Sequence, residues 1–101
     1  MVTLEELKTV YKPQILALAT KQGVTDIRVF GSVARGEQTR QSDVDFLYRR
    51  LPETDLWDLG GLQWGLEELL KTKVQIVDEW SVNEHAFPDE RAHIFREAIY
   101  L

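Results

Sequence analysis

The chain contains the segment Gly31-Ser32-Val33-Ala34-Arg35-Gly36, which is followed after six polar residues by Asp43-Val44-Asp45, and the other predicted elements are arranged around it. A turn flanked by glycines lets the backbone approach a phosphate closely, because glycine has no side chain. Asp43 and Asp45 alternate along the chain, so both carboxylates lie on one face if the segment is a strand. Together the two features favour chemistry on a nucleoside triphosphate.

Strands are predicted on both sides of this turn. The run Asp26–Phe30 is rich in β-branched and aromatic residues and ends at Gly31, which predicts a strand that leads into the turn. Strand character resumes at Val44–Tyr48. One face of this second strand carries Asp43, Asp45 and Leu47, and the other carries Val44, Phe46 and Tyr48. The second strand therefore has one apolar face to bury and one face that presents two carboxylates.

Helices and a third strand are predicted around this unit. Thr3 and Glu6 form a capping-box pattern for a helix that runs to about Gln22, with a kink near Thr9 or Val10 caused by Pro13. The other elements are a helix capped by Thr54-Asp55 and running through Lys71, a strand at Lys73–Asp78, and a last helix that begins at Pro88 and includes Ala98 and Ile99. This order predicts an α/β (α+β) fold in which a small mixed sheet is flanked by helices.

Length and composition are those of one small globular domain, which we expect to span residues 1–101. The chain has 44% hydrophobic residues and no apolar run of the roughly 18 residues that cross a bilayer. Its 17 acidic and 12 basic residues give a net charge of -5, which argues against extended binding to nucleic acid. With no cysteine and no signal-like N-terminal segment, we expect a cytoplasmic protein without membrane contact.

The side chains of the opening stretch fit a nucleotide that binds with a metal ion. Mg²⁺ prefers hard oxygen ligands and usually takes one or two protein carboxylates, which Asp43 and Asp45 can supply. Gly31 permits the close approach of a phosphate, Ser32 offers an N–H and a hydroxyl, and Arg35 can add a charge-assisted contact. Attack at phosphorus needs mainly positioning and charge neutralisation, and these groups are able to provide both.

The same residues carry a resemblance to a known superfamily. Gly31–Gly36 and Ser42-Asp43-Val44-Asp45-Phe46 resemble the Gly-Ser…Asp-x-Asp signature of the DNA polymerase beta-like nucleotidyltransferases. The short chain is most similar to the minimal nucleotidyltransferases (MNT), the antitoxins of prokaryotic HEPN–MNT toxin–antitoxin modules. The resemblance is strong over the strand–turn–strand core and looser over the rest of the chain.

The resemblance implies a nucleotidyl transfer and a role for each site residue. Gly31 and Ser32 would hold the β- and γ-phosphates of ATP, and Asp43 and Asp45 would carry Mg²⁺ as the catalytic carboxylates. The implied acceptor is a tyrosine of a partner HEPN ribonuclease toxin, which the transfer of AMP silences. Larger members of the superfamily hold their acceptor with added domains. Here the partner toxin would itself carry the acceptor hydroxyl.

One position departs from the superfamily pattern. A third carboxylate usually lies within a later strand, and Gln75 stands at that position. An amide is a poor general base, and Asp78 is expected on the opposite face of the strand. Either Asp43 and Asp45 suffice for adenylylation, or the protein is a non-catalytic antitoxin that covers the toxin active site. A small-molecule nucleotidyltransferase is a third interpretation, although the chain lacks the extra length that such enzymes use to hold an acceptor.

Overall fold

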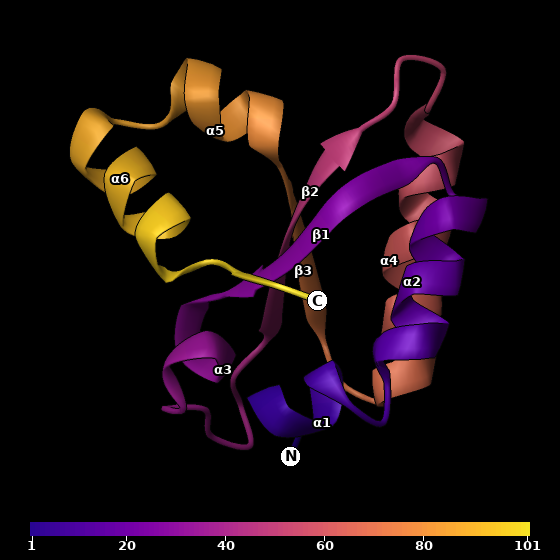
Figure 1. Ribbon diagram of the computed structural model, residues 1–101, viewed down its shortest axis with the longest axis vertical. Helices are drawn as coiled ribbons and strands as arrows, with labels where there is room; N and C mark the ends of the chain where they lie inside the picture. Colours follow the sequence, from indigo (N-terminus) through magenta and orange to yellow (C-terminus); the bar gives the residue numbers. More distant parts are fainter.

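A four-stranded sheet forms the centre of the computed structural model, which describes residues 1–101 (Figure 1). Its strands are β1 (Val24–Phe30), β2 (Val44–Arg50), β3 (Val74–Asp78) and β4 (Ile99–Tyr100), in the order β3-β2-β1-β4. β1 runs antiparallel to β2 and β4, whereas β2 and β3 are parallel. The mixed sheet expected from the sequence is confirmed, with one additional short strand at its edge.

Helices cover both faces of the sheet. They are α1 (Leu4–Lys8), α2 (Lys12–Lys21), α3 (Gly31–Arg35), α4 (Leu56–Leu70), α5 (Glu79–His85) and α6 (Pro88–Glu97). α2 and α4 pack on one face, and α5 and α6 lie on the other side of the sheet (Figure 1). None of the helices is long and apolar enough to span a membrane.

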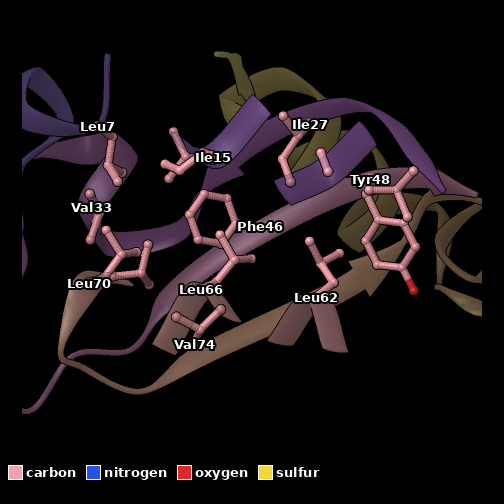
Figure 2. Close-up of a cluster of buried hydrophobic side chains, with 14 residues drawn as sticks. Leu7, Ile15, Ile27, Val33, Phe46, Tyr48, Leu62, Leu66, Leu70 and Val74 are labelled. Atoms are coloured by element: carbon pink, nitrogen blue, oxygen red, sulfur yellow. The ribbon is translucent and has the colours of Figure 1, made fainter. Parts of the chain in front are cut away.

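The hydrophobic core lies between the sheet and the layer that contains α2 and α4 (Figure 2). Phe46 of β2 is fully buried there, in a cluster with Ile15 of α2 and Leu66 of α4. Each large side chain that is fully buried contributes about 1.5–3 kcal/mol, so this cluster is the main source of stability. Because successive strand residues point to opposite faces, burial of Phe46 directs Asp45 towards the layer of α5 and α6.

The first predicted helix is wrong in one respect, since the structure has two helices where the sequence predicts one kinked helix. α1 ends where the N–H of Thr9 donates to the carbonyl of Glu5 at 3.0 Å. α2 begins at Lys12, which places Pro13 in its first turn. A proline is tolerated there because the first N–H groups of a helix have no partner within it. The interruption thus lies where the kink was predicted, near Thr9 and Val10, but it is a break between two helices, and Pro13 belongs to the start of the second.

The last predicted helix is shorter than expected. α6 ends at Glu97, and Ile99, which the sequence places in this helix, pairs instead with Val29 of β1. Tyr100 pairs with Arg28 and leaves its own side chain largely exposed. The edge of β1 offers backbone N–H and C=O groups. Pairing with them gives hydrogen-bond partners to backbone groups of Ile99 and Tyr100 that would have none at the end of a helix. The short helix α5 was not predicted either.

α4 agrees with the predicted second long helix and leaves part of its apolar surface exposed. Asp55 caps the helix in a capping box with Asp58. Trp57 and Trp64 have exposed fractions of 88% and 66%. Neither tryptophan therefore belongs to the core, and both lie on the layer away from Asp45.

Candidate functional site

The carboxylate-bearing face of β2 forms a row with the two adjacent strands. Phe30 of β1, Asp45 of β2 and Gln75 of β3 are aligned by the sheet register, and paired residues of adjacent strands share a face. Asp78 lies on the opposite face from Gln75 and accepts a hydrogen bond from the N–H of Trp80 at 2.9 Å, as the N-cap of α5. The neighbour of Asp45 in β3 is thus a neutral amide, and Asp78 does not replace it.

Gly31–Arg35 folds as the short helix α3 directly after β1. Gly31 has a φ of +75°, in the left-handed region that favours glycine. A Cβ atom at this position would collide with the carboxylate of Asp45. Both the backbone conformation and the close approach of Asp45 therefore require glycine here. Ser32 follows and is half-buried, whereas Arg35 lies exposed in the last turn of α3.

Asp43 and Asp45 lie at the start of β2, next to α3. Asp43 is exposed and Asp45 is half-buried. Burial raises the pKa of Asp45 above its ordinary value, the negative charges of Asp43 and Glu97 raise it further, and the positive charge of Arg35 opposes this rise. Burial accounts for the largest part of this rise, and the parts due to Asp43 and Glu97 reflect three carboxylates that lie close together beside one arginine. The site therefore favours the binding of a cation.

The donor set fits a magnesium ion that is held jointly with a nucleotide. No group of three or more His, Cys, Asp or Glu side chains is arranged to bind a metal ion. Mg²⁺ commonly takes only one or two protein carboxylates and completes its octahedron with phosphate oxygens and water. Asp43 and Asp45 supply two hard oxygen donors beside the backbone that leads into α3, which suits a metal site completed by a triphosphate.

Glu97 of α6 reaches the same place, although the sequence did not indicate it. Its Oε1 accepts a hydrogen bond from the backbone N–H of Gly31 at 2.8 Å, and its Oε2 accepts one from Nη1 of Arg35 at 2.9 Å. Burial alone would raise the pKa of Glu97, but the hydrogen bonds from Arg35 and Gly31 outweigh it and hold the pKa below its ordinary value. Glu97 is 66 positions from Gly31 in the chain, so no local pattern could have revealed this contact.

A cavity of about 370 Å³ adjoins this row, between the sheet and the helices α5 and α6. Phe30, Gln75 and Val77 line its sheet side, and His85 and Ile94 line its helical side. Apolar walls with a few polar groups are typical of pockets that bind small molecules or inserted side chains. Because Gln75 pairs with Asp45, the cavity provides room for part of a substrate next to the two carboxylates.

The sequence and the fold match known proteins over most of their length. Residues 13–101 match the family model described as nucleotidyltransferase domain. The protein adenylyltransferase MntA of Thermococcus cleftensis is 33% identical over 103 residues, which cover 100% of this chain and 98% of that protein. A solved structure, provisionally described as a minimal nucleotidyltransferase, is 38% identical with a TM-score of 0.82, covering 99% of this chain and 97% of that chain.

A more distant structure shares the fold. It is described as a toxin–antitoxin with AMP-PNP and has a TM-score of 0.68 at 22% identity, covering 88% of this chain and 70% of that chain. At this identity the likeness concerns the arrangement of strands and helices. The small mixed sheet with helices on both faces is therefore a recurring architecture.

Proposed function

The chain belongs to the nucleotidyltransferase domain family, and on this basis we propose that it is a protein adenylyltransferase antitoxin whose single domain spans residues 1–101. In the cytoplasm it transfers AMP from ATP, bound with Mg²⁺, to a tyrosine of a cognate HEPN toxin and thereby neutralises that toxin. The observation that carries this proposal is the meeting of Gly31, Arg35 and the Asp43–Asp45 pair where β1 ends and β2 begins.

The proposed chemistry assigns each group one task. Asp43 and Asp45 hold the metal ion, Gly31 and Ser32 bind the β- and γ-phosphates, and Arg35 adds a positive charge. Mg²⁺, when bound, neutralises phosphate charge and orients the triphosphate. The acceptor oxygen bonds to the α-phosphorus while the bond to the bridging oxygen breaks and pyrophosphate leaves. The hydroxyl proton passes to a base from the toxin or to water, because Gln75 is neutral.

Two kinds of observation support a protein as acceptor. A relative that matches over 98% of its length is named a protein adenylyltransferase, and a structure of the same fold is described as a toxin–antitoxin with AMP-PNP. In this chain, Trp80 of α5 and Phe87, which precedes α6, have exposed fractions of 58% and 78%. Trp80 lies on α5 and Phe87 directly before α6, the two helices that also wall the cavity near Asp45, and exposed aromatic side chains are able to anchor a protein partner.

The proposal is tested with ATP carrying a radioactive label at either the α- or the γ-phosphate. The protein is incubated with Mg²⁺ and its folded cognate toxin, and label on the toxin is measured after denaturing electrophoresis. We expect the α-label on the toxin and the γ-label in released pyrophosphate, with no transfer when a chelator removes the metal. Absence of α-label from a toxin that is bound to the antitoxin contradicts the enzymatic proposal, and γ-label on the toxin indicates a kinase instead.

Gln75→Asp is expected to increase the rate of AMP transfer by about tenfold or more, because a carboxylate beside Asp45 can accept the hydroxyl proton or complete the metal ligands. Single-turnover transfer measures this rate directly. Gln75→Asn is the matched control, since it makes the same shortening of the side chain without a charge, and it should bring no increase. Equal rates for the two variants would show that the amide at position 75 does not limit the reaction.

Gln75 is also the specific observation that favours a second function, that of an antitoxin that binds without chemistry. In that case the protein neutralises the toxin in the presence of a chelator, and no α-label reaches the toxin. Neutralisation that requires both ATP and Mg²⁺ excludes this second function.

A further inference from the structure

We propose that Glu97 acts as a built-in phosphate surrogate, which competes with the triphosphate of the nucleotide for the same donors. Its carboxylate accepts hydrogen bonds from the Gly31 N–H and from the Arg35 guanidinium. The proposed function assigns these two donors to the phosphates of the nucleotide. This inference rests on that proposed function, since it takes a triphosphate as the ligand. Glu97 must withdraw before the triphosphate can bind, so it sets the affinity for nucleotide.

The contacts of Glu97 are those of a bound anion. Besides the bonds from Gly31 at 2.8 Å and Arg35 at 2.9 Å, its Oε2 lies 3.2 Å from Nε2 of His93. A carboxylate and a phosphate both accept charge-assisted hydrogen bonds through paired oxygens. The backbone N–H of Gly31 is a single donor, so it serves one well-placed acceptor at a time. Occupation by Glu97 and occupation by a phosphate oxygen therefore exclude each other.

The charges around Glu97 make joint occupation unfavourable as well. Glu97 has an exposed fraction of only 13%, and its charge already raises the pKa of Asp45. A triphosphate would bring further negative charge to Arg35, whose charge Glu97 and Glu37 already share at 2.9 and 3.1 Å. Like charges at such short range repel each other strongly when they are partly buried. Movement of Glu97 away from the donors removes this repulsion.

α6 is built so that this movement is easy. The helix has no buried residue, in contrast to α4, which buries Leu62, Leu66 and Leu70 in the core. Its contacts with α3 include the hydrogen bonds of Glu97, so α6 can shift without opening the core. Because nucleotide binds only when Glu97 has withdrawn, the apparent nucleotide affinity equals the intrinsic affinity multiplied by the fraction of molecules in which the site is open.

The test is the affinity of the full chain for ATP and for inorganic tripolyphosphate, measured by calorimetry. Glu97→Gln removes the charge and should tighten both affinities by about tenfold, as expected when roughly one molecule in ten is open. Adenosine, which carries no phosphate, should show no such change. A residue with a purely structural role would not tighten binding when it is replaced.

Glu37→Gln is the matched control. It removes the same charge from a second carboxylate that binds Arg35, but Glu37 does not contact Gly31 and is largely exposed. Its effect on either affinity should stay below about twofold, because exposed ion pairs contribute little. If both variants tighten the affinities for ATP and tripolyphosphate equally, the cause is the loss of one negative charge near Arg35. That result would overturn the surrogate role of Glu97.

The remaining outcomes are also decisive. Weaker or unchanged phosphate binding in Glu97→Gln, with a loss of transfer, would make Glu97 a positioning residue and overturn the inference. Absence of ATP binding by both the original chain and the variant would overturn the proposed function, and the inference with it. If Glu97→Gln does not fold, NMR of the unaltered chain decides. Saturating tripolyphosphate should shift the Gly31 amide and the Arg35 Nη resonances, the two groups that bind Glu97, with one midpoint. Unchanged Arg35 Nη resonances contradict displacement.

Discussion

Replacement of both Asp43 and Asp45 by asparagine is expected to lower the rate of AMP transfer by about 1000-fold or more. The loss of charge stabilisation in phosphoryl chemistry amounts to several kcal/mol, and each 1.4 kcal/mol corresponds to about a factor of ten. The free energy of unfolding should not decrease, because burial and the neighbouring negative charges already disfavour the ionised form of Asp45. Single-turnover transfer and denaturant unfolding measure the two effects separately.

The double variant also separates catalysis from binding. If the toxin is neutralised by adenylylation, Asp43→Asn/Asp45→Asn should still bind the toxin and fail to neutralise it. Glu53→Gln/Glu68→Gln, which removes two exposed charges away from Asp45, is the control and should retain both properties. Full neutralisation by the aspartate double variant would contradict the enzymatic mechanism. A large loss of stability would contradict the account of the charges around Asp45.

Gly31→Ala is expected to destabilise the fold by about 2 kcal/mol or more and to abolish AMP transfer. A left-handed backbone conformation in a residue other than glycine costs about 1–3 kcal/mol, and the added Cβ would also collide with the carboxylate of Asp45. Relief of this collision moves either Asp45 or the backbone N–H of residue 31, and both belong to the site. Urea unfolding and transfer assays on the same preparation measure the two losses.

Gly36→Ala separates the two causes. Gly36 has almost the same φ, +73° against +75° for Gly31, but a Cβ atom there would meet nothing within 4 Å. It should therefore lose only about 1–2 kcal/mol, the cost of the left-handed backbone conformation alone. Asp45→Ala in the Gly31→Ala background should restore part of the stability, as a double-mutant cycle measures. Equal losses for the two glycine variants would mean that contact with Asp45 is unimportant.

The parts of this structure that the sequence predicted have local signals. The alternation around Phe46 sorts the residues of β2 onto an apolar and an acidic face, and burial in the core confirms this assignment. The pair Thr54-Asp55 predicted the start of α4, because a capping residue there immediately precedes an apolar helical pattern. Such signals depend on residues within one or two turns of each other, which a single sequence displays directly.

The parts that were missed depend on distant contacts or on conflicting local signals. Leu7, Tyr11 and Ile15 keep helical spacing across the break between α1 and α2, so periodicity continues through residues that are not helical. β4 is only two residues long and forms because the edge of β1 is available. The same pairing brings Glu97 close to Gly31, and the sequence around either residue gives no indication of this contact.

The position of β2 between β1 and β3 has a consequence for protein engineering. Its residues serve the core on one face and the carboxylate site on the other, so a library that randomises β2 should contain few members that fold and still bind nucleotide. α6 has no buried residue and faces the cavity beside Gln75. A library that randomises α6 and keeps Glu97 should therefore contain mostly folded members.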